Sequence, residues 1–376
     1  MLTRFDHLLE FFMNIYLCYA YMPNTTALYF ERALQQEHKV YYVGPSSNGR
    51  LGYDSTIDVN DLINWGLPSP DLFLLIEPAL GFFPRGLERV NCPTAIYLID
   101  VHRHLGFRMR YAPFFDYIFV AQRDYVQKFR DAGFQQTSWL PLACDPELHG
   151  HRDLNKQWDV GFVGNINSST RSRRLKLLSQ FFTINDYLKP YPKEKIGEIY
   201  SQSRIVINSS IDNDLNMRVF EAMASGSLLL TDKIGNGQSA LFENQVHFLE
   251  YKDDEEMIQL ARYYLDHPEE SHSIASTGMQ LVHSKHTYLH RCHEMINTIF
   301  GHGKPNFAAH IRQLDQLHLH LAYAKFYSGM NFIDALLDEL ERAWKHRRGY
   351  IYIWGYIFFA LTKKLYRISK LPKSTA

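Results

Sequence analysis

The stretch that decides the fold runs from residue 216 to residue 232 and reads N-M-R-V-F-E-A-M-A-S-G-S-L-L-L-T-D. Phe220 and Met223 recur at the three-residue spacing of one helical face, which predicts a short helix packed on a core. Gly226 predicts the end of that helix, because glycine adopts the left-handed cap conformation at little cost. Residues 227–231 are apolar without alternation, as is typical of a strand covered on both faces. The stretch therefore predicts a helix followed by a buried parallel strand.

Two charged residues share another face of the same predicted helix. Arg218 and Glu221 are three residues apart and lie in its first turns. A helix amino end favours anions, an arginine can pair with phosphate, and a glutamate can accept hydrogen bonds from ribose hydroxyls. The pattern therefore suits a nucleotide diphosphate. The alternative is an ordinary arginine–glutamate pair on the surface of a packing helix.

Apolar runs and helical stretches alternate through most of the chain. The strands expected in the first half, around a helix near residues 25–36, cover residues 14–21, 39–43, 72–76, 94–99, 117–121 and 138–141. A polar patch at 149–158 separates them from a second series at 159–163, 205–208 and 227–231. This alternation predicts an α/β fold with two successive domains, residues 1–150 and 151–300, each built on a parallel sheet.

Polar residues follow several of the strands expected in the first half. Ligands of parallel sheets bind at the carboxyl ends of strands, which places these residues at one rim: Glu77, Asp100, His102, Arg103 and His104. His102 is the best candidate to touch an acceptor or to polarise a reacting centre, and Asp100 is a candidate to orient it or act as a base. The alternative is a rim histidine without chemistry, because 18 histidines make chance placement common.

The second series of strands opens with a polar turn, G-N-I-N-S-S-T-R at residues 164–171. It lacks the G-x-G-x-x-G pattern, so it fails as a dinucleotide fingerprint. Gly164 and Asn165 still offer backbone donors where a helix begins, and a cluster of arginines follows: Arg171, Arg173 and Arg174. The alternative is a solvated, basic helix start.

Length and composition fit a two-domain protein of the cell interior. The chain has 376 residues, of which 46% are hydrophobic, and its 40 basic and 40 acidic residues cancel. This neutrality does not point to nucleic acid as a partner. The four cysteines are scattered without C-x-x-C spacing, which predicts reduced thiols. Because Asp6 and Glu10 interrupt the apolar amino end, we expect no secretion signal and a cytoplasmic location.

The pattern changes after residue 301. Residues 317–344 predict two helices around Ser328-Gly329, most simply a helical hairpin packed on the main body. Residues 350–361 are nearly all apolar or aromatic between basic flanks, but are too few to span a bilayer. They suit peripheral contact with a membrane surface or a partner protein, and a helix buried on the amino-terminal domain is the alternative.

Five ordered fragments carry a resemblance to a known family. They are R-V-F-E-A-M-A-S-G-S-L-L-L-T-D at 218–232, A-L-F-E at 240–243, Y-Y-L-D-H-P-E-E at 263–270, I-A-S-T-G at 274–278 and K-H-T-Y-L-H-R at 285–291. Together they resemble the donor-binding half of GT-B glycosyltransferases, specifically the CgeB-like group. Weaker matches are Y-L-I-D-V-H-R at 97–103 and W-L-P-L-A-C-D at 139–145.

The resemblance implies two Rossmann-like domains with an inter-domain cleft, here followed by a helical extension at 301–376. It implies transfer of a sugar from a nucleotide-sugar to an unidentified acceptor (a glycan, lipid or protein), with retention of configuration and with neither a metal nor another cofactor. The expected donor-binding residues are Gly164, Asn165, Arg171, Asn208, Arg218, Phe220 and Glu221. The expected catalytic residues are His102, Asp100 and Asn213.

Asn213 marks a departure from the family pattern. Many related enzymes carry two glutamates separated by seven residues, and Asn213 stands where the first would be relative to Glu221. An amide can bond to sugar hydroxyls but cannot act as a carboxylate. The surrounding D-N-D at 212–214 imitates a D-x-D metal motif, and we interpret it as a solvated acidic loop. Neither His102/His104 nor His318/His320 has a third ligand that the sequence identifies, so no metal site is assigned.

Two other classes of function fit the same two-domain pattern. A nucleotide-sugar epimerase or another group-transfer enzyme would convert the donor without an acceptor. A binding or scaffold protein would have a cleft without chemistry, which the missing first glutamate favours. Failure of every nucleotide-sugar to raise the melting temperature would support the scaffold.

Overall fold

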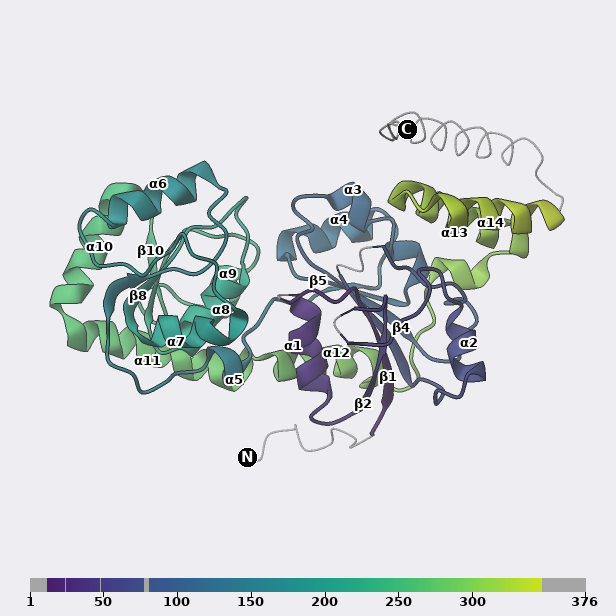
Figure 1. Cartoon of the computed structure of the whole chain (residues 1–376), viewed down its shortest axis with the longest axis horizontal. Helices are drawn as coiled ribbons and strands as arrows, with labels where there is room; N and C mark the ends of the chain where they lie inside the picture. Colours follow the sequence, from purple (N-terminus) through teal and green to yellow (C-terminus); the bar gives the residue numbers. More distant parts are fainter. Residues whose placement is uncertain (1–11, 24, 48, 78–80, 347–376) are drawn as a thin grey trace, which may run out of the picture.

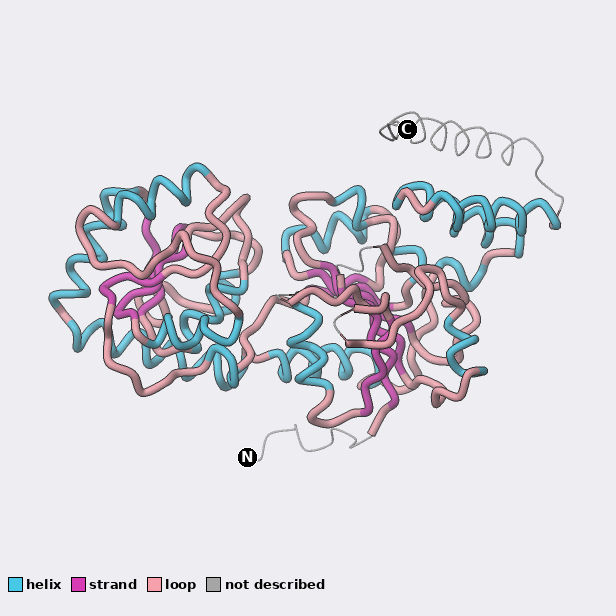
Figure 2. The backbone as a smooth tube through the Cα atoms, in the orientation of Figure 1, coloured by secondary structure: helices cyan, strands magenta, loops and turns pink. Residues whose placement is uncertain are grey.

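The computed structural model describes residues 12–23, 25–47, 49–77 and 81–346. Within them the chain forms two lobes that lie side by side, each a β-sheet covered by helices (Figure 1). Figure 2 shows the strands gathered in two separate groups, one in each lobe. The α/β class expected from the sequence is confirmed.

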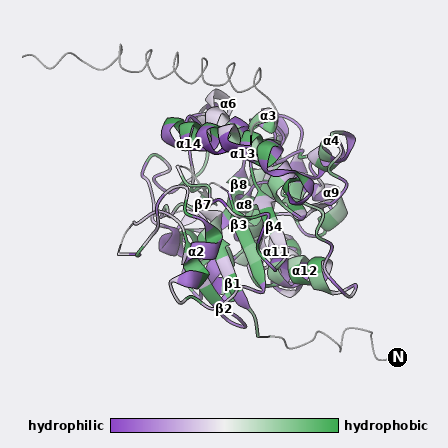
Figure 3. Ribbon diagram, turned by 90° about the vertical axis from the view of Figure 1, so that its right-hand side faces the viewer, coloured by the Kyte–Doolittle hydropathy of each residue, from purple (hydrophilic) through white to green (hydrophobic). Residues whose placement is uncertain are grey.

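The first lobe is built on a six-stranded parallel sheet in the order β2-β1-β3-β4-β5-β6. Its strands, each overlapping an expected one, are β1 (Asn14–Cys18), β2 (Lys39–Val43), β3 (Leu72–Ile76), β4 (Thr94–Leu98), β5 (Tyr117–Val120) and β6 (Thr137–Trp139). The helices of this part are α1 (Thr26–Leu34), α2 (Val59–Asn64), α3 (Leu105–Arg108) and α4 (Val126–Asp131), with 3₁₀ turns at Ala112–Phe114 and Arg123–Tyr125. Every residue of β3 and β4 is buried, and both strands are hydrophobic (Figure 3).

The second lobe is built on a four-stranded parallel sheet in the order β10-β9-β8-β7. Its strands are β7 (Trp158–Gly161), β8 (Ser203–Asn208), β9 (Leu228–Asp232) and β10 (Leu249–Tyr251). The helices are α6 (Ser169–Leu178), α7 (Ile196–Ser201) after a 3₁₀ turn at Lys193–Lys195, α8 (Met217–Ala224), α9 (Gln238–Leu241), α10 (Asp254–Asp266) and α11 (Pro268–Lys285). The sequence analysis did not predict β10, because its three residues, L-E-Y, include a glutamate and do not form an apolar run.

Helix α8 forms as the 216–232 stretch predicts. The Asn216 side chain caps it by accepting a hydrogen bond from the backbone N–H of Arg218. Phe220 and Met223 are fully buried, and Gly226 has a φ of +73° just beyond the end of the helix. The chain then turns directly into β9, so the first turn of α8 lies beside the carboxyl ends of the strands.

The two lobes are joined twice. Helix α5 (Pro146–His149) follows the first connection, and α12 (Tyr288–Phe300) follows the return. At the crossing, the backbone of Cys144 bonds to His286 and Tyr288 on the returning segment. Helix α12 then packs against α1, so the chain ends its second series of elements on the first lobe.

The chain continues through a 3₁₀ turn (His310–Gln313) into a hairpin of α13 (Gln316–Met330) and α14 (Ile333–Lys345). The predicted turn at Ser328-Gly329 is wrong by a few residues, because both lie within α13. Asn331, with a φ of +63°, makes the break instead, as asparagine tolerates the left-handed conformation. The apolar side of the hairpin packs in one core with Phe83 and Phe114 of the first lobe.

Among the described residues, no helix has the length and apolar character needed to cross a bilayer. The apolar segment predicted at 350–361, with its proposed membrane or partner contact, lies outside them.

Candidate active site

A cleft of about 590 Å³ opens between the two lobes, at the carboxyl ends of the strands. Residues from both lobes line it, and most of them are charged: Asp100, His102 and Arg103 from the first, and Gly164, Asn165, Arg171, Asp214, Arg218 and Glu221 from the second. A larger hollow of about 1000 Å³ beside α3 and α13 has no carboxylate in its lining. The inter-lobe cleft is therefore the candidate active site.

Arg218 lies folded over the turn that follows β7. Its Nε and Nη2 both donate to the carbonyl oxygen of Val163, at 3.1 and 3.0 Å, and Nη1 donates to Oδ1 of Asn208 at 2.8 Å. The guanidinium also lies 4.2 Å from the ring centroid of Phe162. Gly164 is required for this approach, because a Cβ atom there would stand 2.1 Å from Nη2 of Arg218. Its φ of +147° is also rare for other residues.

Arg171 brings a second guanidinium to the cleft. Its Nε and Nη2 donate to the carbonyl oxygen of Ser209, and Nη1 donates to that of Asn165 at 2.6 Å. Burial, together with the nearby charge of Arg218, lowers the pKa of Arg171 to about 10. In the part of the chain that the structure describes, neither guanidinium forms an ion pair. Two buried positive charges thus lie at the cleft without a carboxylate partner among the described residues, an arrangement that favours binding of an anion.

The other arginines of the predicted basic turn do not reach the cleft. Arg173 pairs with Asp254, and Arg174 pairs with both Asp254 and Asp232. Of the three arginines that follow the turn in the sequence, only Arg171 lines the cleft. These two point toward the acidic start of α10, whose first turn is rich in carboxylates.

Glu221 lies on the cleft wall one turn after Arg218 and is only 6% exposed. His149, which was not among the predicted residues, approaches it with Nε2 at 3.5 Å from Oε1. Nδ1 of His149 accepts a hydrogen bond from the backbone N–H of Asp145, so Nε2 carries the ring proton. Burial lowers the pKa of His149, and the neutral ring therefore directs an N–H group at the Glu221 carboxylate.

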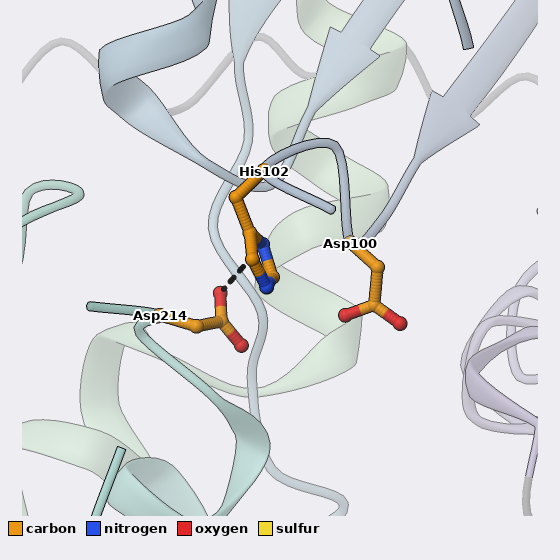
Figure 4. Close-up of side chains that lie close together, drawn as sticks. All are labelled: Asp100, His102 and Asp214. Atoms are coloured by element: carbon orange, nitrogen blue, oxygen red, sulfur yellow. Dashed lines mark ion pairs between the residues drawn. The ribbon is translucent and has the colours of Figure 1, made fainter. Parts of the chain in front are cut away.

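Asp100, His102 and Asp214 lie close together where the two lobes face each other (Figure 4). Nδ1 of His102 is 3.7 Å from Oδ1 of Asp214, and the His102 side chain is 3% exposed. Nδ1 has no hydrogen-bond partner among the described residues. One ligand atom from each of the three residues falls within 4.8 Å of the others, so these residues could also hold a cation. Burial raises the pKa of Asp214, while a hydrogen bond from Gln122 opposes the rise.

The predicted solvated loop at 212–214 is wrong for its last residue. Asp212 and Asn213 are exposed and both have a positive φ, at +53° and +61°. This tight turn directs Asp214 inward, where its carboxylate is buried. Asn213 does not line the cleft, because its Oδ1 accepts the backbone N–H of Gly235 at 2.6 Å. Asp214, rather than Asn213, therefore lines the cleft.

The remaining predicted residues divide between the core and the cleft. Phe220 is fully buried against Phe242 and lies in the core, because it faces away from Arg218 on α8. Asn208 is also fully buried, and its Oδ1 accepts the hydrogen bond from Nη1 of Arg218 without lining the cleft itself. Seven predicted residues line the cleft together: Asp100, His102, Gly164, Asn165, Arg171, Arg218 and Glu221.

One of the expected rim residues, Glu77, does not line the cleft. Glu77 is buried and forms an ion pair with Arg108, in which Nε of Arg108 lies 2.9 Å from Oε1 of Glu77. The loop before α7 adds further lining residues on the donor side: Lys189, Pro190, Tyr191 and Lys193.

Comparison with known proteins agrees with this geometry. Residues 151–297 match the family model described as glycosyl transferase-like. This segment of the chain is therefore similar to glycosyl transferase-like proteins, and it carries Arg171, Arg218 and Glu221. No curated protein sequence matches the chain closely enough to count as a relative.

Solved structures share the two-lobed arrangement. An α-glucosyltransferase in complex with UDP and a 13-mer DNA containing an HMU base is similar over 77% of this chain and 99% of that chain, at 9% identity and a TM-score of 0.55. T4 phage BGT in complex with its UDP-glucose substrate matches over 77% and 100%, at 12% identity and 0.52. Sucrose-phosphate synthase from Thermosynechococcus elongatus matches over 77% and 100%, at 11% identity and 0.52. The chain thus has the GT-B fold of these glycosyltransferases.

Proposed function

We propose that the protein is a glycosyltransferase that moves a sugar from a nucleotide-sugar to a hydroxyl group of a glycan, lipid or protein. The observation that carries this proposal is the pair of guanidiniums, Arg171 and Arg218, buried at the cleft without an ion pair among the described residues. A diphosphate supplies the negative charge that such a pair lacks. The glycosyl transferase-like match over 151–297 and the GT-B fold support the same assignment.

In this proposal the diphosphate lies over Gly164 and the first turn of α8. Negative charge builds up on the diphosphate as its bond to the sugar lengthens, and fixed donors around it lower the free energy of that state. Arg218 supplies N–H groups, and the amino end of α8 supplies a favourable dipole. These groups suffice to hold the leaving group, so we propose a reaction that needs no metal and no cofactor beyond the nucleotide-sugar.

Glu221 is proposed to accept the ribose hydroxyls, with the N–H group of His149 facing its carboxylate at 3.5 Å. The loop that carries Pro190, Tyr191 and Lys193 is proposed to contact the base, because its side chains line the same cleft. His102 is proposed to act at the reacting centre from the opposite lobe. Retention of configuration and membership of the CgeB-like group are further proposals, supported by the ordered motifs between residues 218 and 291.

The first experiment is a thermal-shift screen of nucleotides and nucleotide-sugars, beginning with UDP-glucose because T4 phage BGT binds it. We expect one nucleoside diphosphate and its sugar conjugate to raise the melting temperature, while the free nucleoside raises it much less. Release of the diphosphate, with water or an added acceptor, would then measure turnover. Turnover should persist in a chelator. The absence of a shift with every nucleotide-sugar would contradict the proposal, and product formation without any acceptor or water attack would favour an epimerase.

We also propose a cytoplasmic location, which the four cysteines support because all are buried and free.

A further inference from the structure

Gln122 connects the two lobes beside His102. Its Oε1 accepts the backbone N–H of Val101 at 3.1 Å, and its Nε2 donates to Oδ1 of Asp214 at 2.9 Å. The orientation of the amide is fixed, because a backbone N–H can only donate and so requires the oxygen. The side chain is 1% exposed, so this bridge is shielded from water. Gln122 therefore ties the loop that carries His102 to a carboxylate of the other lobe.

The same carboxylate oxygen faces the ring of His102. Oδ1 of Asp214 is 3.7 Å from Nδ1 of His102, which is longer than a hydrogen bond, and this Nδ1 is buried without a partner in the described structure. A movement of less than about 1 Å would close the gap to an ordinary hydrogen-bond length. Further contacts between the lobes lie alongside, where the backbone N–H of Asn236 donates to Asp124 at 3.2 Å.

We propose that Asp214, held by Gln122, is the positioning residue of His102, so that the reactive orientation of this histidine is completed only when the two lobes approach each other. The proposal rests on the proposed transferase function and adds to it a residue from the donor lobe. An N–H···O bond from Nδ1 to Asp214 leaves Nε2 unprotonated and directed to accept a hydrogen bond from a hydroxyl at the reacting centre. The carboxylate also stabilises positive charge that develops on the ring.

Two neighbouring carboxylates must be distinguished from Asp214. Asp100 lies beside His102 but is exposed, so water competes for its oxygens. Asp212 is also exposed, and no hydrogen bond joins its side chain to His102 among the described residues. Asp214 alone of the three is buried and bonded across the lobes. Asp212 consequently offers a matched control: the same chemical change, two residues away, outside the proposed contact.

The test compares Asp214→Asn, Asp214→Ala, Gln122→Met and the control Asp212→Asn in a diphosphate-release assay with the nucleotide-sugar found by the thermal-shift screen. Asp214→Asn keeps an oxygen for Gln122 and His102 but removes the charge, and Asp214→Ala removes both. We expect kcat to fall at least tenfold in Asp214→Ala and less in Asp214→Asn, with KM for the donor within about twofold of wild type. Asp212→Asn should retain wild-type kcat.

A double variant tests whether Gln122 and Asp214 act as one unit. If they do, Gln122→Met combined with Asp214→Ala should lower kcat no further than Asp214→Ala alone, within about twofold. Independent, multiplying losses would contradict the proposal, as would wild-type kcat in a folded Asp214→Ala protein. Binding of one Mn²⁺ that Asp214→Asn abolishes, with turnover that depends on the ion, would also overturn it and make the cluster a cation site. If the wild type neither binds nor turns over any nucleotide-sugar, the transferase function itself fails.

Discussion

Replacement of Arg218 tests the proposed diphosphate site most directly. Three of the five N–H groups of its guanidinium donate to Val163 and Asn208, which leaves capacity for at least one bond to a phosphate oxygen. One hydrogen bond to a charged group contributes about 1.5–3 kcal/mol. Arg218→Gln should therefore weaken binding of the nucleoside diphosphate roughly 10- to 150-fold. Arg218→Lys, which keeps the charge but not the planar fork, should lie between wild type and this value.

The assay is calorimetric titration with the nucleoside diphosphate and, separately, with its nucleoside. Only the diphosphate should lose affinity, because the nucleoside has no group that Arg218 contacts. Arg173→Gln is the matched control, since Arg173 carries the same charge in the same lobe but pairs with Asp254 outside the cleft. Equal weakening of both ligands would indicate that the cleft has collapsed. A folded Arg218→Gln protein with diphosphate affinity within twofold of wild type would refute the reasoning.

Three further changes have defined outcomes. Glu221→Ala should bind the ribonucleotide about tenfold more weakly than the wild type does, while its affinity for the 2′,3′-dideoxynucleotide should not change. If a titration shows that the variant keeps the wild-type preference for the ribonucleotide, the proposed contact between Glu221 and the ribose is wrong. Gly164→Ala should lower the unfolding free energy by about 1–3 kcal/mol in urea and also weaken diphosphate binding, because its Cβ displaces Arg218. Burial raises the pKa of Glu77 to about 7 from its ordinary 4.5, so the folded protein retains a proton that the unfolded chain has lost. The unfolding free energy should consequently fall as pH rises from about 4.5 to 7, and Glu77→Gln should flatten this slope in pH-dependent urea denaturation; an identical slope would exclude the effect.

The sheets could be predicted from the sequence, because a parallel strand that is buried on both faces consists of a short run of apolar residues. Each strand of the first sheet overlaps a predicted run, and α8 with Gly226 forms as its periodicity requires. The three-residue strand β10 was not predicted, because its hydrogen-bonded pairing with β9, rather than its own sequence, makes it a strand. The break of the helical hairpin also moved, because Asn331 could take the left-handed conformation while Gly329 continued the helix.

The site was predictable only where chemistry and local pattern coincide. Arg218 and Glu221 stand on one helix face, so their joint presence at the cleft followed from spacing. His149 and Gln122 could not be found in this way, because their roles depend on partners 72 and 92 residues away in the sequence. Asp214 was wrongly predicted to lie in a solvated loop for a related reason. The positive φ values of the two preceding residues turn its side chain inward, and this backbone conformation cannot be inferred from the composition of the loop.

The double crossing between the lobes has a consequence for how this protein can be divided. A fragment limited to residues 151–297 would carry nearly all of α12 without α1, the helix it packs against. Buried side chains such as Cys292 and Met295 would then be in water. The segment that matches the family model therefore lacks part of its packing when it stands alone. We expect two halves divided at residue 150 to aggregate when they are expressed separately and to form one folded complex when they are co-expressed.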